Sequence, residues 1–200
     1  MGAAVYLDLA PHLPSIDLYT KRLHHYNMIL KDLFEDLYNK LCECLSSQLG
    51  APVKMDSRLA YPGFHIYECL KSGMPDGLAY GGSIHRDMTE RHINWNETLG
   101  PKCTVHLDKK ISFTVPIAIP KHGAGLNYWD GLSNHLPAFD GGFFMGLDAR
   151  TQRWLEDQRQ HCEYVLGNMV CHNGDLFHQI ANDSPLVKGD IRMTLQGHGI

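Results

Sequence analysis

The hydrophobic pattern of this chain changes its period near residue 52, and this change constrains the fold more than any other feature. Between residues 15 and 49, apolar side chains recur every three or four residues, which is typical of an amphipathic α-helix. Ser15 is placed to cap this helix, and Gly50 and Pro52 are placed to end it. From residue 53 onward, short apolar or alternating runs are separated by Gly, Pro, Asn and Asp, which is typical of antiparallel β structure.

The strand-rich part has enough short runs to form two facing sheets. Their number and spacing predict a mainly β fold, a cupin-like double-sheet jelly roll or double-stranded β-helix, with a flanking N-terminal helix. Residues 148–161 are more polar and are expected to form a short helix or loop inserted between strands. The expected strands are 64–69, 78–85, 103–107, 111–119, 125–129, 163–166, 169–172, 176–181 and 191–197.

Length and composition fit a single domain. The chain has 200 residues, of which 44% are hydrophobic and 20% are charged, and this is enough to bury one core and a small-molecule cavity. We expect one domain over residues 1–200, in which residues 1–52 form a helical part that packs on the sheet and residues 53–200 form the jelly-roll core.

Charge and cysteine content exclude several classes of partner. The formal net charge of −4, with scattered Lys and Arg, argues against nucleic acid, and no apolar run approaches the ~20 residues of a membrane span. The six cysteines form no CxxC pair, which indicates reduced thiols. We therefore expect a cytoplasmic protein that acts on a small molecule and has no nucleic-acid or membrane partner. A homodimer is compatible with the sequence.

Two segments far apart in the chain supply a set of metal ligands. His85 and Asp87 are separated by one residue, so an extended strand projects both to one face and turns Arg86 away. His178 follows the turn at Gly174 in an apolar run that would seat it inside a barrel. Two imidazoles and one carboxylate on one face of an iron leave open positions, which is the ligand set of non-haem Fe(II) oxygenases. We predict that His85, Asp87 and His178 are the metal ligands and the catalytic centre.

The other histidines are weaker candidates. His172 is the alternative third ligand, although it precedes the turn at Gly174 rather than following it. His65 and His106 lie on expected strands and are candidates for the wall of the cavity. The remaining ones are expected to be structural or exposed, namely His12, His24, His25, His92, His122, His135, His161 and His198.

An arginine and a threonine downstream of His178 predict an anion site. The turn-rich segment between His178 and Arg192 would let the strand of Arg192 return antiparallel beside that of His178, and Thr194 would share its face. A guanidinium fork matches a carboxylate, and a buried arginine needs such an anion. The expected occupant is the distal carboxylate of 2-oxoglutarate. A structural pairing of Arg192 with Asp190 or Asp175 is the alternative.

These residues together resemble the pattern of a known family. The sequence His85-Arg86-Asp87, then His178, then Arg192-Met193-Thr194 is similar to the His-x-Asp, distant His and Arg-x-Ser/Thr pattern of the 2-oxoglutarate and Fe(II)-dependent dioxygenases. The resemblance covers residues 55–198 and includes the Gly-Ala-Gly-Leu-Asn-Tyr-Trp stretch at 123–129. It implies Fe(II) as cofactor, 2-oxoglutarate and O2 as co-substrates, and oxidation of a small organic molecule such as an amino acid derivative or a specialised metabolite. Because halogenating relatives lack the carboxylate, Asp87 favours hydroxylation, desaturation or ring formation.

Two other functions stay open at this point. A cupin-like metalloenzyme, such as an isomerase or a dioxygenase, would use the same ligands without a 2-oxo acid and would not need Arg192. A non-catalytic jelly-roll binding module would use the histidines only for packing. Specificity would come from the loops at 56–63, 88–100, 130–146 and 148–161.

Overall fold

The computed structural model describes residues 2, 16–68, 84–87, 93–121, 124–130, 149–181 and 187–200. The chain divides into two compact units. The first is Met1–Phe64 with Thr89–Val105, and the second is His65–Met88 with His106–Ile200. The expected single domain with a division at residue 52 stays a prediction.

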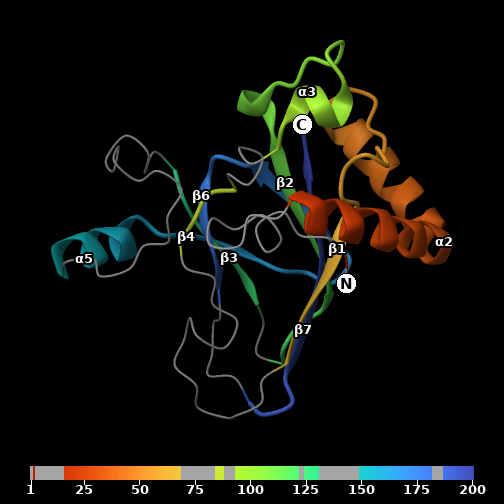
Figure 1. Cartoon of the computed structure of the whole chain (residues 1–200). Coiled ribbons are helices and arrows are strands. Elements are labelled where there is room, and N and C mark those ends of the chain that lie inside the picture. The colour runs from red at the N-terminus through yellow and green to blue at the C-terminus, as the bar shows by residue number, and fades with distance from the viewer. Residues whose placement is uncertain are drawn as a thin grey trace. The chain divides into compact units, whose positions relative to one another are not determined.

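The first unit is built on the long helix α2, Ile16–Leu49 (Figure 1). Its buried stripe recurs at the predicted spacing and includes Tyr19, Leu23 and Leu30. The backbone at Phe34, with φ −132° and ψ 25°, is non-helical and kinks α2 there. Gly50 adopts a φ of +65°, the left-handed conformation that commonly follows a helix C-terminus, so the predicted end is confirmed. The predicted cap, Ser15, lies outside the described residues.

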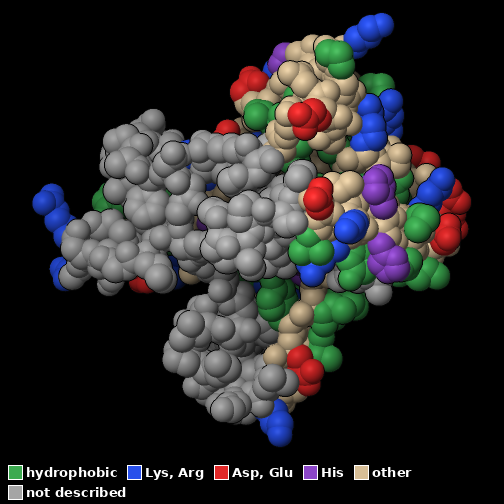
Figure 2. All heavy atoms as spheres, viewed as in Figure 1, with side chains coloured by type: hydrophobic (Ala, Val, Ile, Leu, Met, Phe, Trp, Pro, Cys, Tyr) green, Lys and Arg blue, Asp and Glu red, His purple; other side chains and the backbone are tan. Residues whose placement is uncertain are grey.

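Buried polar contacts tie the segment after α2 back to this helix. Asn27 donates to the Leu59 carbonyl at 2.8 Å and accepts from the Tyr61 N–H at 3.0 Å. The Tyr38 hydroxyl donates to the Pro62 carbonyl at 2.7 Å, and burial raises the pKa of this hydroxyl. A short helix, α3 (Trp95–Leu99), also belongs to this unit. Over the α2 region, Figure 2 shows basic, acidic, histidine and hydrophobic side chains interspersed, so this face has no patch of one charge.

The second unit contains two antiparallel sheets (Figure 1). The strand order is β1-β7-β2-β5 in the four-stranded sheet and β4-β3-β6 in the three-stranded sheet. This mostly antiparallel architecture and the N-terminal helix confirm the β-rich class that the sequence predicted. The strands are β1 Gly63–Glu68, which begins in the first unit, β2 Ile111–Ala118, β3 Gly125–Trp129, β4 Gln160–Glu163, β5 Val170–Asn173, β6 Phe177–Ala181 and β7 Ile191–Gly199.

Different parts of the protein pack against the two faces of the three-stranded sheet. On one face, Trp129, Phe177 and Leu155 form a buried cluster with the helix α5, Ala149–Gln158, and the Trp129 indole donates to the Leu155 carbonyl at 2.7 Å. We call this the outer face. The opposite face carries Leu126, which packs with Tyr164 and with Val170 of the four-stranded sheet. This inner face therefore lies between the two sheets.

Several expectations from the sequence need correction. Residues 103–107 form no strand; instead, the Cys103 N–H bonds to Gly100 and a 3-10 turn, η2, covers Leu107–Lys109. The run alternates, but it is too exposed to bury a sheet face. Of the strand expected at 163–166, only Glu163 lies in a strand, at the end of β4, which follows α5. Residues 164–166 form no strand.

The strand that carries Arg192 does not pair with the strand that carries His178. β7 lies between β1 and β2 in the four-stranded sheet, whereas β6 pairs with β3 in the other sheet. Nine residues, 182–190, separate these two strands in the sequence, more than in usual hairpins, so the two strands need not pair. No described helix is long and apolar enough to cross a membrane, and the described cysteines, Cys42, Cys44, Cys103, Cys162 and Cys171, are free thiols.

Candidate metal centre

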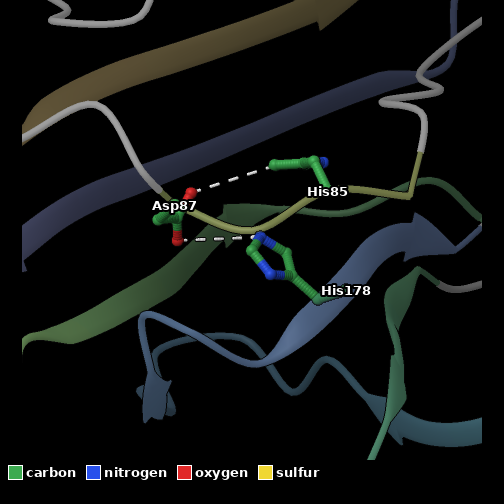
Figure 3. Close-up of side chains that lie close together, drawn as sticks. All are labelled: His85, Asp87 and His178. Carbon is green, nitrogen blue, oxygen red and sulfur yellow. Dashed lines mark ion pairs between the residues drawn. The ribbon is translucent and has the colours of Figure 1, made fainter. Parts of the chain in front are cut away.

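His85, Asp87 and His178 come together in the second unit (Figure 3). One ligand atom from each lies within 4.8 Å of the other two. The His85 Nε2 is 3.9 Å from Asp87 Oδ1, and the His178 Nε2 is 3.7 Å from Asp87 Oδ2. Among the described residues, this is the one group of three His, Cys, Asp or Glu side chains with the spacing of a metal site.

Backbone hydrogen bonds hold the two contributing segments together. His85 and His178 form an antiparallel bridge in which each N–H donates to the carbonyl of the other residue at 2.9 Å. Two residues further on, the Asp87 N–H donates to the Gly174 carbonyl at 3.0 Å. Arg86 lies over the Phe177 ring at 4.9 Å, on the outer face, as the one-residue spacing predicts. The positions of both histidines and the carboxylate are therefore set by main-chain pairing.

The local hydrogen bonds fix which nitrogen of His178 can bind a metal. Its Nδ1 lies 2.9 Å from the Leu176 carbonyl, which can only accept, so Nδ1 carries the proton and the lone pair is on Nε2. This Nε2 is the atom that faces Asp87. Burial lowers the pKa of His178 to about 4, against the opposing effect of the Asp87 carboxylate. The imidazole is therefore neutral at neutral pH, which is the form that coordinates metals.

Asp87 is held as a carboxylate by its neighbours. Burial would raise its pKa, but His198, His178 and His85, together with a hydrogen bond from Ser112, hold the pKa of this group well below its ordinary value. The Ser112 Oγ donates to Asp87 Oδ2 at 2.6 Å. The charge needed to bind a cation is therefore present over the whole neutral range.

The donor set fits a small divalent cation. Nitrogen and oxygen ligands about 2.0 to 2.2 Å from one ion lie roughly 3 to 4 Å from each other, depending on the angle between them. His85 Nε2 lies 3.9 Å from Asp87 Oδ1 and His178 Nε2 lies 3.7 Å from Asp87 Oδ2, so each imidazole has one carboxylate oxygen within this range. Two imidazoles and one carboxylate suit iron and leave positions for other ligands.

Arg192 and Thr194 are both completely buried, with 0% exposure. They lie two residues apart on β7 and therefore share a face, which also carries His198. The Arg192 guanidinium lies 5.7 Å from the centre of the Tyr67 ring and 5.6 Å from that of Tyr164. Because Tyr164 packs with Leu126 on the inner face, this guanidinium lies between the two sheets, although its strand β7 does not pair with β6 as the sequence predicted.

The alternative residues take different positions. His172 lies on β5 with its ring 4.6 Å from that of His178, but it is not part of the three-residue group. His65 lies on β1, and burial lowers its pKa to about 4, with Arg192 acting in the same direction. His106 is exposed and precedes η2, so it does not line the interior. Asp175 pairs with Lys110 at 3.0 Å.

Sequence reasoning missed two residues beside the carboxylate. The sequence pattern predicts no role for Ser112, and it predicts that His198 is structural or exposed. His198 Nδ1 lies 3.0 Å from Ser112 Oγ and 3.9 Å from Asp87 Oδ2. The one signal for His198 in the sequence is its spacing. It lies an even number of residues after Arg192 and Thr194, so on an extended strand it shares their face. The contribution of Ser112 depends on the register between β2 and β7, which spacing does not reveal.

Comparisons with known proteins give distant likenesses. No protein-family model matches the chain, and no curated protein matches it. It is similar to a solved structure of an N-substituted L-amino acid dioxygenase from Burkholderia ambifaria AMMD, with a TM-score of 0.35 and 10% identity over 68% of this chain and 46% of that chain. A structure of such a dioxygenase in complex with alpha-KG gives a TM-score of 0.37 and 10% identity over 90% of this chain and 71% of that chain. The chain thus spans under half of the length of the first of these structures.

Proposed function

We propose that this protein is a 2-oxoglutarate-dependent non-haem Fe(II) oxygenase that oxidises a small organic molecule, with hydroxylation favoured. The observation that carries this proposal is the group of His85, Asp87 and His178, whose ligand atoms lie within 4.8 Å of one another. Two imidazoles and one carboxylate hold a metal on one side and leave the other side open. This arrangement suits a metal that must also bind two small co-substrates.

In this proposal each residue of the group has a defined task. His85 and His178 each offer Nε2, Asp87 offers a carboxylate oxygen, and a bound Fe(II) supplies the redox chemistry that couples O2 to a 2-oxo acid. The bond between His178 Nδ1 and the Leu176 carbonyl keeps the ring oriented toward the metal. The burial of His178 excludes water from one side of the reacting atoms.

Arg192 and Thr194 are proposed to bind the distal carboxylate of 2-oxoglutarate. Their complete burial, their common face on β7 and the location of the guanidinium between the sheets support this role. A guanidinium can give a carboxylate two parallel charge-assisted hydrogen bonds, and the Thr194 hydroxyl can add another. A small molecule is the favoured substrate, because the net charge of −4 does not attract nucleic acid.

We also propose that the second unit is a double-stranded β-helix. Along the chain, β1 and β2 belong to one sheet, β3 and β4 to the other, and β5, β6 and β7 then alternate between the sheets. A jelly roll has eight strands in two sheets, and the segment 84–87, which bridges to the free edge of β6, supports an eighth position. In such a barrel the two sheets enclose one site.

Anaerobic titration of the Fe(II)-loaded protein with 2-oxoglutarate tests the proposal. We expect the weak visible charge-transfer band of a chelated 2-oxo acid in the wild type. The band should be lost in His178→Ala because iron is lost. In Arg192→Ala it should need on the order of 100-fold more 2-oxoglutarate, because a buried charge-assisted pair is removed.

The control and the contrary outcomes are distinct. His161→Ala is a matched control, because His161 is an exposed histidine on the outer face. It pairs in register with Asn127. Asn127 points to the opposite side from its neighbour Tyr128, which pairs with His178 on the inner face. It should keep the band. Iron binding without any band would assign the site to a metalloenzyme that needs no 2-oxo acid. Absence of iron binding in the wild type would overturn the metalloenzyme proposal.

A further inference from the structure

Ser112 and His198 form a hydrogen-bonded chain that ends on the metal-facing carboxylate. Ser112 is 4% exposed and lies directly opposite His198 in the register of β2 and β7. Its Oγ lies 2.6 Å from Asp87 Oδ2 and 3.0 Å from His198 Nδ1. These distances connect a buried hydroxyl to two groups at once.

The direction of both hydrogen bonds follows from the proton count of the hydroxyl. A serine hydroxyl has one proton, and an ionised carboxylate can only accept, so Ser112 donates to Asp87 Oδ2. The bond to His198 must then run the other way, with Nδ1–H donating to Ser112 Oγ. His198 therefore orients the hydroxyl so that its proton points to the carboxylate.

We propose that Ser112 and His198 are positioning residues that hold Asp87 as a one-oxygen metal ligand. This inference rests on the proposed function. Ser112 engages Oδ2, which also lies 3.7 Å from His178 Nε2, whereas Oδ1 lies 3.9 Å from His85 Nε2 and takes no bond from Ser112. We therefore assign Oδ1 as the oxygen that binds the metal. A carboxylate that used both oxygens would occupy a second coordination position. Holding Oδ2 on Ser112 keeps that position open for a co-substrate.

His198 is assigned to positioning rather than to metal ligation. Its Nδ1 is turned to Ser112, and its ring is not part of the group in which all ligand atoms lie within 4.8 Å of one another. Hydrogen bonds to metal ligands from neighbouring side chains orient those ligands, and their loss typically lowers metal affinity by about 10- to 100-fold.

The experiment measures Fe(II) affinity anaerobically, by competition with a chromophoric chelator, on the full-length protein and its variants. We expect Ser112→Ala to weaken Fe(II) binding by about 10- to 100-fold and His198→Ala by about 10-fold. The double variant should bind Fe(II) as Ser112→Ala does, because His198 acts only through the hydroxyl. This lack of additivity separates positioning from a general structural effect.

Two conservative variants keep the test decisive if the alanine variants fold poorly. Ser112→Thr retains the hydroxyl, and His198→Asn offers an amide N–H near the position of Nδ1, so both should retain most of the wild-type affinity. His198→Phe retains the ring shape without the donor and should match His198→Ala. Circular dichroism verifies the fold of each variant, and His161→Ala serves as the unaffected histidine control.

Each contrary outcome has one meaning. If the wild type binds no Fe(II), the proposed function is wrong and this inference falls with it. If the wild type binds Fe(II) and Ser112→Ala binds it equally well, the inference alone is wrong. If His198→Ala abolishes binding as His178→Ala does, or if the two losses add, His198 does not act through Ser112.

Discussion

The two faces of the three-stranded sheet differ in chemistry although they share the same strands. Phe177 and His178 are neighbours on β6, yet Phe177 packs with Trp129 and Leu155 on the outer face and His178 meets Asp87 on the inner face. The outer face is an apolar core under α5, whereas the inner face carries neutral imidazole and ionised carboxylate. Because alternate residues point to opposite sides, one short strand can serve stability and chemistry separately.

The largest expected effects come from truncating these two adjacent residues separately and comparing the losses of stability and of iron binding. Phe177→Ala should lower the free energy of unfolding by about 3 to 5 kcal/mol, because it leaves a cavity in the outer cluster. Urea unfolding of the metal-free protein measures this loss. His178→Ala should cost less stability than Phe177→Ala but should abolish Fe(II) binding. If Phe177→Ala removed iron binding while remaining folded, the two faces would not be separable.

Acid should destabilise the inner face in a defined pH range. The pKa of buried His178 is lowered from 6.5 to about 4, so between these values the unfolded chain binds a proton that the folded protein does not. The contribution of neutral His178 to the free energy of unfolding is fully present above about pH 6.5. It should fall by about 3 kcal/mol as the pH drops to 4. His65 acts in the same direction. The measurement is urea unfolding with a chelator present at several pH values.

The control for this pH dependence is a histidine replacement. His178→Gln removes the titrating ring and should flatten part of the slope between pH 6.5 and 4. An equally steep slope in this variant would assign the acid sensitivity to other groups, beginning with His65.

What the sequence predicted well depends on local geometry. β3 was predicted at its observed bounds, because an apolar run lies between glycine-containing and polar turns. The common face of His85 and Asp87 follows from the two-residue period of extended chain, and the end of α2 follows from Gly50.

What the sequence missed depends on pairing across strands. The location of β7 between β1 and β2, and the approach of Ser112 to Asp87, are set by which strands meet and in which register. Spacing along one segment contains no such information. The run at 103–107 alternates in polarity but forms no strand. Alternation predicts a strand only where one face of the segment is buried against other parts of the protein.

Gly174 offers a sharper test of how the inner face is held. A Cβ at this position would lie 2.8 to 3.0 Å from the Lys110 side-chain carbons, and the Gly174 carbonyl accepts the Asp87 N–H. Gly174→Ala should therefore cost about 1 to 3 kcal/mol of stability and also weaken Fe(II) binding, because Asp87 shifts with the carbonyl. Thermal unfolding and the chelator competition measure the two effects.

A second variant separates packing from charge at this turn. Asp175→Asn removes the ion pair with Lys110 but leaves the glycine, and because Asp175 is half-exposed it should cost less than about 1 kcal/mol. If Asp175→Asn weakened iron binding as much as Gly174→Ala, the ion pair, rather than the close approach of the lysine stem, would be holding Asp87.

The last prediction compares one buried polar residue on the outer face with one on the inner face. Asn127 is 8% exposed, and its side-chain oxygen lies 3.0 Å from His161 Nδ1 on the outer face, much as Ser112 bonds His198 on the inner side. Asn127→Ala should cost about 1 kcal/mol, the net value of one such bond, and should leave Fe(II) affinity unchanged. Ser112→Ala loses similar bonds but should also weaken iron binding. Equal effects of both variants on iron would mean that the metal site senses general loosening of the sheets rather than the bond to Asp87.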